Sequence, residues 1–251
     1  MSSFKMIKGT ALALCLSVTF SAQAFDFGKA IESAVTLGKA ATLSDSDVNA
    51  YFGQMSKKYD AENKVAPASN KYAKRLATIT KGLKNYDGLS LNFKVYLSPE
   101  VNAFAMGDGT VRVYSGLMDL MTDDEVRSVI GHEIGHVKLG HSKKRMQTAM
   151  TTSALRNVAS AAGGTVASLS DSQLGDLTEN VVHAQFSQSN ENDADSYGLK
   201  MLQATGKNPM ASVTSLEKLS TLSDNDGGGL MATHPSSSSR AERMRQQIAK
   251  K

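Results

Sequence analysis

Three residues near the middle of the chain have the types and the spacing of a catalytic metal site. His132, Glu133 and His136 form the pattern H-E-x-x-H. Side chains four residues apart lie on one face of an α-helix, so both imidazoles can reach a single Zn²⁺ ion from the same side. Glu133 is offset by one position, beside a water molecule whose pKa the ion lowers to about 7. In this hypothesis Glu133 takes the proton of that water, the resulting hydroxide attacks a peptide carbonyl, and Glu133 passes the proton to the leaving amine.

A pattern with three fixed positions also occurs by chance, and the same side chains can be ordinary solvated groups on a surface helix. Two observations argue against chance. The motif lies in a segment with strong helix signals and apolar neighbours, and acidic residues downstream can supply another ligand. These observations favour a metal site.

A catalytic zinc site needs a third protein ligand and an open fourth position. The five histidines of the chain are residues 132, 136, 141, 183 and 234. His141 does not complete the longer pattern H-E-x-x-H-x-x-G-x-x-H, because Leu139 and Ser142 stand where Gly and His are required. In a continuous helix His141 would also lie about 140° round the axis from His136. We therefore expect a structural role for His141 at the helix end.

Glu191 and Asp195 are better candidates for completing the site. They are four residues apart, so on a helix they share a face. One carboxylate can bind the metal while the other accepts a hydrogen bond from a ligating imidazole and fixes its tautomer. Acidic pairs at this spacing are common on solvated faces, but together with His132 and His136 the pair gives a His₂Glu set, which is a known catalytic zinc set.

The helix that carries the motif has a clear start. Thr122 is a good N-cap residue, and Glu125 stands at the capping-box position. Three acidic residues in the first turn also suit the helix dipole. The apolar side of this helix is predicted at Val126, Val129, Ile130, Ile134 and Val137.

Three short strands are predicted before this helix. Residues 91–97 alternate between apolar and polar side chains, and residues 102–106 and 110–114 form two more strands around a turn at Gly107-Asp108-Gly109. Helices are predicted over residues 25–62 (one or two, with a cap at 44–47), 72–83, 174–186, 194–204 and 240–251. This order predicts an α+β fold that is mainly helical, with a small β-sheet beside the active-site helix.

The composition is that of a globular protein. The 251 residues are 41% hydrophobic and 21% charged, which excludes a disordered chain, a collagen-like repeat and a multispan membrane protein. The net charge is only +4, and there is no dense basic run with interleaved aromatic residues. We therefore expect no nucleic-acid partner.

The N-terminus has the pattern of a secretory signal. Lys5 and Lys8 precede an apolar stretch over residues 10–20, and small residues at positions 22 and 24 predict cleavage after Ala24. The stretch is shorter than the roughly 20 apolar residues of a transmembrane helix, and no such helix is expected in the mature chain. Cys15, the only cysteine, lies in the middle of this stretch, so a lipid anchor is the minority interpretation. The expected location is the periplasm, where the mature chain has neither disulfides nor thiol catalysis.

Several stretches together resemble the HtpX and CAAX-prenyl-protease-like zinc metallopeptidases, which are gluzincins, and in particular periplasmic envelope proteases of bacteria. The matching residues are 102–105, 113–117, 124–125, 129–137, 141, 191–195, 233–235 and 240. The resemblance covers about residues 66–245. The chain is thus expected to have three parts: the signal peptide at 1–24, an N-terminal helical segment at 25–65 and, as the resemblance implies, a zincin-like zinc metallopeptidase domain at 66–251.

The resemblance also implies the roles of individual residues. One Zn²⁺ ion per chain is expected on His132, His136 and Glu191, with Glu133 as the general base and Asp195 as the partner of a ligating imidazole. His234 matches the His-Pro element of the family, where the histidine lies near the metal as a resting-state ligand or as a group that stabilises the transition state. Arg240 is a weaker candidate for stabilising the oxyanion. The strand Asn102, Ala103, Phe104 and Ala105 resembles the edge strand that pairs with an extended substrate.

The function implied is a zinc endopeptidase that acts on unfolded or misassembled cell-envelope proteins. The alternative is a periplasmic, chaperone-like assembly factor with latent protease activity, in which His234 blocks the open zinc position. A structural zinc protein is a third reading. Glu133 favours catalysis, because binding alone needs no general base. The transmembrane helices and C-terminal helical repeats of some relatives are not found in this sequence, and an association with the outer membrane or a partner there rests on analogy alone.

Overall fold

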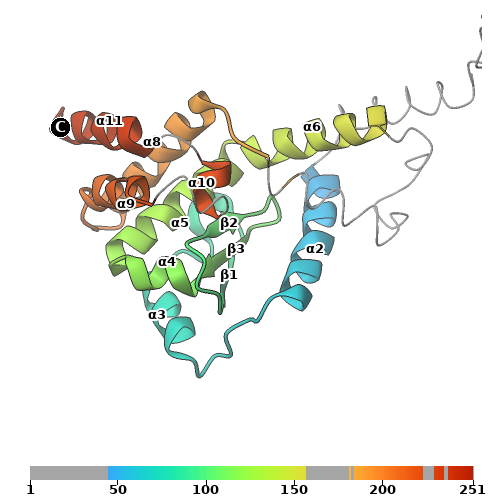
Figure 1. The fold of residues 1–251 in the computed structure, drawn as a ribbon, viewed down its shortest axis with the longest axis horizontal. Helices are drawn as coiled ribbons and strands as arrows, with labels where there is room; N and C mark the ends of the chain where they lie inside the picture. Colours follow the sequence, from blue (N-terminus) through green and yellow to red (C-terminus); the bar gives the residue numbers. More distant parts are fainter. Residues whose placement is uncertain (1–44, 157–180, 182–183, 223–228, 235–236, 251) are drawn as a thin grey trace, which may run out of the picture.

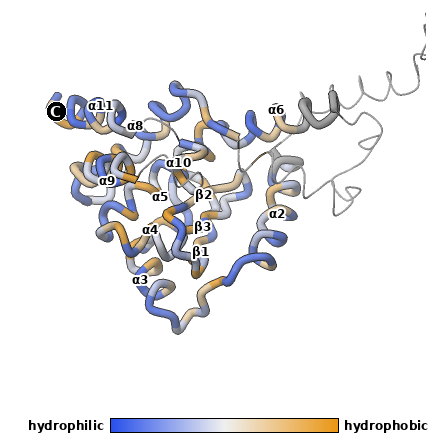
Figure 2. The backbone as a smooth tube through the Cα atoms, viewed as in Figure 1, coloured by the Kyte–Doolittle hydropathy of each residue, from blue (hydrophilic) through white to orange (hydrophobic). Residues whose placement is uncertain are grey.

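The structure is a computed structural model that describes residues 45–156, 181, 184–222, 229–234 and 237–250. The predicted signal peptide, residues 25–44, His183, Pro235 and most of the helix predicted over 174–186 lie outside these residues. Figure 1 shows a small central sheet between helices, with α5 on one side and α2 on the other. In Figure 2 the hydrophobic segments gather around the strands and α5. No helix of the described part is long and apolar enough to span a membrane.

The sheet has three short strands, as predicted, in the order β1-β3-β2. The strands are β1 (Asn92–Tyr96), β2 (Ala103–Ala105) and β3 (Thr110–Tyr114). β1 and β3 are parallel, whereas β2 and β3 form the predicted antiparallel hairpin. Its turn needs glycine at Gly109, where φ is +85° and a Cβ atom would lie 2.0 Å from the carbonyl oxygen of Ser90. The outer edge of β1 is paired with residues 64–66, so β2 presents the other edge.

One face of the sheet packs against α5 (Asp123–Lys138). Cross-strand partners share a face, and Val95, Ala103, Val111 and Val113 are all at most 2% exposed. They belong to one core cluster with Val126, Val129, Ile130 and Ile134 of α5. This is the apolar side predicted for the motif helix, except that Val137 is only partly buried. The largest core therefore lies directly behind the H-E-x-x-H motif.

The opposite face is covered by α2 (Asp45–Glu62). The ring of Tyr59 lies edge-on to Phe104 of β2, with 5.4 Å between the centroids. Asp60 accepts hydrogen bonds from Arg112, Lys94 and Tyr96, which stand on this face of β3 and β1. Both faces of the small sheet are thus covered by helices.

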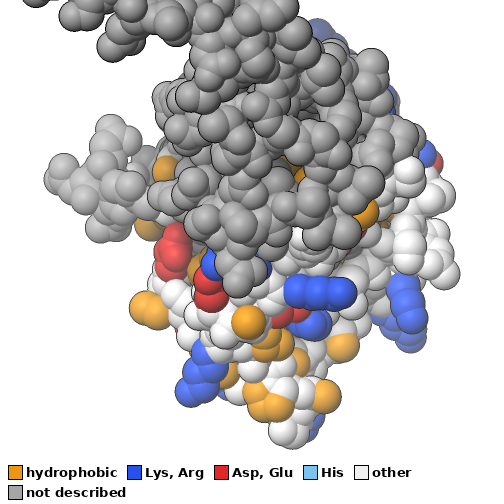
Figure 3. Space-filling view, turned by 90° about the vertical axis from the view of Figure 1, so that its right-hand side faces the viewer, with side chains coloured by type: hydrophobic (Ala, Val, Ile, Leu, Met, Phe, Trp, Pro, Cys, Tyr) orange, Lys and Arg blue, Asp and Glu red, His pale blue; other side chains and the backbone are white. Residues whose placement is uncertain are grey.

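The remaining helices surround α5. They are α3 (Lys71–Ile79), the 3₁₀ turn η1 (Tyr86–Gly88), α4 (Ser115–Leu120), α6 (His141–Arg156), α8 (Gln188–Ala204), α9 (Ala211–Ser220), α10 (Leu230–Thr233) and α11 (Ser237–Ala249). α8 lies along α5, and a separate apolar cluster joins α8, α9 and α11 through Leu199, Val213, Leu216, Ala241 and Met244. On the face shown in Figure 3, the Lys and Arg side chains of the described residues are scattered and form no single patch.

The α+β prediction is confirmed, and most predicted elements are present. α5 starts after Thr122 with both hydrogen bonds of the capping box. The helix predicted up to residue 186 is wrong at its end, because residues 184–187 are not helical. Ser187 instead caps α8, which begins six residues before the predicted start at 194. The helix predicted over 72–83 ends at Ile79, and the last helix begins at Ser237 rather than at 240.

Candidate metal centre and active site

Four buried side chains from three helices meet at one point. His132 and His136 come from α5, Glu191 comes from the first turn of α8, and His234 is the C-cap residue of α10. One ligand atom from each lies within 4.8 Å of all the others. Nε2 of His132 is 3.0 Å from Nε2 of His136 and 3.2 Å from Nδ1 of His234. Oε1 of Glu191 is 3.4 Å from Nε2 of His136 and 3.0 Å from Nδ1 of His234.

These atoms come together because α5 and α8 cross at very close range. Gly131 and Gly135 of α5 face Gly198 and Ala194 of α8. A Cβ atom on Gly198 would lie 3.0 Å from the backbone nitrogen of His132, which is tighter than most contacts of a real Cβ atom. The small residues therefore set the distance between the two imidazoles and the carboxylate of Glu191.

The cluster fits a tetrahedral divalent metal ion. With metal–ligand distances of about 2.0–2.2 Å, the ligand atoms of a tetrahedral zinc site are about 3.3–3.6 Å apart. In the structure, His132 lies 3.0 and 3.2 Å from the ring nitrogens of His136 and His234, and the histidine nitrogens lie 3.0–3.6 Å from the Glu191 oxygens. Hydrogen bonding among these groups does not explain the arrangement, because Nε2 of His132 faces two other ring nitrogens at once. Three imidazoles and one carboxylate form a donor set that zinc accepts.

Asp195 and Arg240 hold this cluster from behind. Nδ1 of His132 lies 2.9 Å from Oδ1 of Asp195, so the ring carries its proton there and its Nε2 lone pair faces the cluster. Burial lowers the pKa of His132, but the hydrogen bond with Asp195 outweighs it and the pKa is raised. Burial raises the pKa of Asp195, but hydrogen bonds with Arg240 and His132 hold it well below its usual range. Burial also raises the pKa of Glu191, but its interactions with His234 and His136 outweigh burial, and the pKa is lowered.

Arg240 contacts the two carboxylates behind His132. It is 3% exposed, and its guanidinium contacts Asp195 at 2.7 and 2.9 Å and Oε2 of Glu191 at 2.5 Å. It lines a small cavity behind His132 rather than the pocket in front of Glu133. The geometry makes Arg240 a positioning residue for the two carboxylates and does not favour the expected oxyanion role.

A second set of contacts around His136 was not predicted. The ring of Phe186 is stacked on His136 with 3.6 Å between the centroids, and the guanidinium carbon of Arg145 lies 3.4 Å from the centroid of Phe186. The His136 ring and the Arg145 guanidinium are each too close to the centre of the Phe186 ring to lie on the same face of it. The ring of Phe186 therefore lies between Arg145 and His136. Burial lowers the pKa of His136 well below its usual value, which keeps the ring neutral and able to bind a metal.

His141 lies closer to the site than the helical spacing suggested. α5 ends at Lys138, Gly140 has φ of +74°, and His141 begins α6. The turn brings Nδ1 of His141 to 3.0 Å from Nδ1 of His136. The angle of 140° between His136 and His141 assumed a continuous helix and does not apply, whereas the structural role at a helix end stays a prediction. Gly140 was the signal that could have revealed the break.

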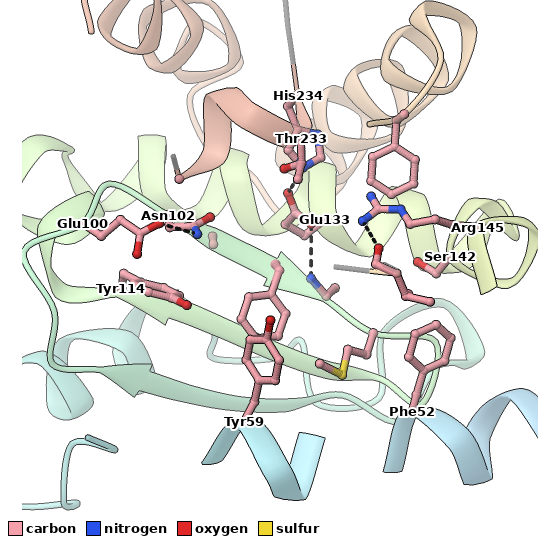
Figure 4. Close-up of a pocket in the computed structure, with 17 residues that line it drawn as sticks. Phe52, Tyr59, Glu100, Asn102, Tyr114, Glu133, Ser142, Arg145, Thr233 and His234 are labelled. Atoms are coloured by element: carbon pink, nitrogen blue, oxygen red, sulfur yellow. Dashed lines mark hydrogen bonds and ion pairs between the residues drawn. The ribbon is translucent and has the colours of Figure 1, made fainter. Parts of the chain in front are cut away.

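Glu133 lies between the cluster and the sheet edge (Figure 4). It is 2% exposed, and its Oε2 accepts a hydrogen bond from the backbone nitrogen of Ala105 at 3.2 Å. Its Oε1 is 3.4 Å from Nε2 of His234 and accepts no hydrogen bond from any described residue. A buried carboxylate oxygen without a hydrogen bond is costly, which marks it as a functional candidate.

The predicted substrate strand lines a pocket of about 110 Å³ in front of Glu133. Asn102, Ala103, Phe104 and Ala105 all contribute to its walls, and so does His234. The carbonyl of Asn102 and the backbone nitrogen of Met106 bond to β3. By the alternation of a strand, the backbone groups of Ala103 and Ala105 point to the outer edge, beside Glu133. The structure thus brings together all the predicted site residues, with Asp195 and Arg240 behind the cluster and the strand 102–105 in front of Glu133.

Comparison with known proteins agrees with this geometry. Residues 70–248 match peptidase family M48. The chain is 44% identical to the metalloprotease LoiP of Escherichia coli (strain K12), over 97% of this chain and 98% of that protein. It is 43% identical to the metalloprotease YcaL of the same organism, over 89% of each chain. The beta-barrel assembly-enhancing protease of E. coli is 28% identical over 77% of this chain, which corresponds to 40% of that longer protein. The chain therefore belongs to peptidase family M48 and is a metalloprotease.

Proposed function

We propose that the chain is a zinc-dependent endopeptidase that hydrolyses peptide bonds in unfolded or misassembled cell-envelope proteins. The observation that carries this proposal is the convergence of His132, His136 and Glu191 beside the carboxylate of Glu133, at the outer edge of a β-strand. The similarity to a beta-barrel assembly-enhancing protease supports a role in the quality control of envelope proteins.

In this proposal His132, His136 and Glu191 hold one zinc ion. The ion supplies Lewis-acid chemistry, which polarises a carbonyl group and lowers the pKa of water. Asp195 keeps the proton of His132 on Nδ1, so that Nε2 remains a ligand. Glu133 accepts a proton at Oε1 and delivers it to the leaving amine, while the hydrogen bond from Ala105 to Oε2 holds the carboxylate in place.

The strand edge explains why unfolded chains are the proposed substrates. An extended peptide can pair with the backbone groups of Ala103 and with the carbonyl group of Ala105 by main-chain hydrogen bonds, which depend little on sequence, while the backbone nitrogen of Ala105 donates to Glu133. Folded proteins rarely offer such a segment, because their backbone groups are already paired. The edge therefore selects for the folding state of the substrate more than for its sequence.

Export to the periplasm is a separate part of the proposal. It rests on the basic residues, the apolar stretch and the small residues that end at Ala24. We expect the mature protein in periplasmic extracts to begin at Phe25, which N-terminal sequencing can test. Recovery of the protein with residues 1–24 still attached would contradict it. A partner at the outer membrane would be sought by crosslinking in the same extracts.

The main experiment is a cleavage assay with zinc-loaded residues 25–251 and an unfolded protein as the substrate. Glu133→Gln keeps an oxygen that can accept the bond from Ala105 but cannot take the proton. We expect cleavage by the wild type and a loss of at least about 1,000-fold in kcat for the variant, because both the base and the acid step are removed. Equal activity of the two proteins would exclude the proposed role of Glu133.

The position of His234 favours a second candidate, a latent protease with a chaperone-like binding role. Its Nδ1 lies 3.2 Å from Nε2 of His132 and 3.0 Å from Oε1 of Glu191, where catalytic zinc sites keep an open position. If His234 blocks that position, His234→Ala should raise peptide cleavage while zinc remains bound. Lost or unchanged activity in this variant would count against such gating.

A further inference from the structure

Helix α2 lies outside the region that matches the family and yet forms one wall of the active-site pocket. The match begins at residue 70, whereas α2 covers Asp45–Glu62. Phe52 and Tyr59 of this helix line the same pocket as Glu133 and the edge strand. In Figure 4 both rings rise from α2 towards the pocket, on the opposite side from Glu133.

An ion pair between the partly exposed Asp60 of α2 and the buried Arg112 of β3 fixes the position of α2. Both oxygens of Asp60 accept hydrogen bonds from Arg112, at 2.8 Å from Nε and 2.9 Å from Nη2. Nζ of Lys94 at 2.7 Å and the hydroxyl of Tyr96 at 2.8 Å complete the set. Arg112 is 2% exposed, so this cluster attaches α2 firmly to the middle of the sheet.

The attached helix presents a continuous apolar face. Phe52, Met55 and Tyr59 are three, four and seven residues apart, so they line one side of α2. Phe52 and Met55 are in one core cluster with Met106, which follows β2, and Tyr59 packs on this cluster together with Phe104. The pocket wall opposite Glu133 is therefore made of large apolar groups from α2 and from the sheet edge.

A peptide paired with β2 would place side chains against this wall. The side chains of a paired strand follow the pleat of the sheet and point alternately to its two faces. One face is covered by α5 with Glu133, and the other, which carries Phe104, is covered by α2. Every second side chain of the paired peptide thus lies on the same face as Phe104, which is the face that α2 covers with Tyr59 and Phe52.

We propose that α2 forms the wall of a specificity subsite, in which Tyr59 and Phe52, together with Phe104 and Met106, accept one large apolar side chain of the extended substrate. The pocket of about 110 Å³ lies between this apolar wall and Glu133, so a side chain that points away from Glu133 meets the wall. This inference rests on the proposed function, since it assumes that a peptide pairs with β2. It adds that the preference is set by a helix outside the region matched by the family.

Two readouts with matched peptides test the proposal. In one series of internally quenched peptides, each position in turn carries Phe or Ala, and kcat/KM is measured for the wild type and for Tyr59→Ala. In parallel, the Kd values of the same peptides are measured in the non-cleaving Glu133→Gln background. At one position we expect the wild type to prefer Phe by about 10- to 100-fold, and Tyr59→Ala to lose most of this preference in both readouts.

Matched variants separate the subsite from general destabilisation. Tyr59→Phe keeps the ring and should keep the preference, whereas Tyr59→Trp should narrow the pocket and lower kcat/KM for the Phe peptide. Lys57→Ala changes an exposed position on the same helix and should have no effect. The inference is overturned if Tyr59→Ala and Tyr59→Trp retain the preference for Phe while binding zinc. If the wild type cleaves nothing but the binding preference still depends on Tyr59, the protease proposal fails and the subsite remains.

Discussion

Two charge clusters of this chain, one partly exposed around Asp60 and one buried around Glu191, use similar groups in opposite ways. Around Asp60, four donor atoms from Arg112, Lys94 and Tyr96 point at the two oxygens of one carboxylate. Around Glu191, three imidazoles turn ring nitrogens towards the carboxylate and towards one another at 3.0–3.6 Å. The first cluster satisfies itself, whereas the second brings acceptors together around a common point.

The difference shows which cluster is structural and which is functional. The carboxylate of Asp60 already has four donor atoms around it, and it fixes α2 on the sheet. A set of lone pairs that face one another is unfavourable until a cation binds between them. Glu133 adds to this, because its Oε1 accepts no hydrogen bond from the residues that the structure describes. We therefore expect the chemistry at the cluster around Glu191 and Glu133, where acceptor atoms of the described residues lack hydrogen-bond donors.

The largest expected effect is that of removing the metal. A ligand present at about 1,000 times its Kd stabilises the folded state by about 4 kcal/mol, which corresponds to about 8–16 °C in Tm for a domain of this size. We expect a chelator to abolish cleavage and to lower Tm by this amount, and added zinc to restore both. Calorimetry with and without chelator measures the shift. His136→Ala should show no response to the chelator; a response equal to that of the wild type would contradict the assignment of His136 as a ligand.

Substitutions in the Asp60 cluster should lower the stability of the fold without changing the affinity for zinc. Asp60→Ala leaves Arg112 buried without its carboxylate, and we expect a loss of about 3 kcal/mol in the free energy of unfolding. Urea denaturation measures the loss, and zinc affinity should be unchanged. Replacing both partners, with Asp60→Leu and Arg112→Met, should recover a large part of the stability, because no buried charge remains. A change in zinc affinity in these variants would show that the two clusters are coupled.

Much of the site could be predicted because its signals are local. The cap at Thr122 and Glu125, the helical spacing of the H-E-x-x-H motif and the spacing of Glu191 and Asp195 need no knowledge of the rest of the fold. The hairpin of β2 and β3 was likewise marked by its turn residues.

What could not be predicted depends on contacts between distant parts of the chain or on helix ends. Asp60 and Arg112 are 52 residues apart, and nothing in the alternation of β3 reveals that α2 covers the face of Arg112. Phe186 was predicted to be helical, but it lies outside any helix and its backbone nitrogen donates to the carbonyl of Thr233. His141 was misplaced because the helix was assumed to continue past Gly140.

A smaller effect is expected at the crossing of α5 and α8, which sets the geometry of the metal cluster. Gly198→Ala adds a Cβ atom 3.0 Å from the backbone nitrogen of His132, and backbone cannot easily move away. We expect a loss of about 1–3 kcal/mol in stability and weaker zinc binding, because α8 carries Glu191 and Asp195 away from the imidazoles. Zinc titration of this variant and of Lys200→Ala, an exposed control on the same helix, tests this. Wild-type zinc affinity in Gly198→Ala would show that the close crossing does not position the ligands.

The smallest effect is the contribution of Asp60 to the dependence of stability on pH. Burial raises the pKa of Asp60, but its bonds with Arg112, Lys94 and Tyr96 outweigh this and lower it from 3.8 to about 2. A carboxylate whose pKa is depressed in the folded state stabilises that state above the unfolded pKa, and this contribution is lost as the pH falls from about 4 through about 2. We expect about 1–2 kcal/mol, because the group is partly exposed. The measurement is the difference in unfolding free energy between the metal-free wild type and Asp60→Asn from pH 5 to pH 2. The carboxylates of the metal cluster titrate in both proteins, so their contributions cancel in this difference. If the difference stays constant over this range, the carboxylate of Asp60 is not held by its donors in solution. The Asp60 cluster would then not be the structural counterpart of the metal cluster.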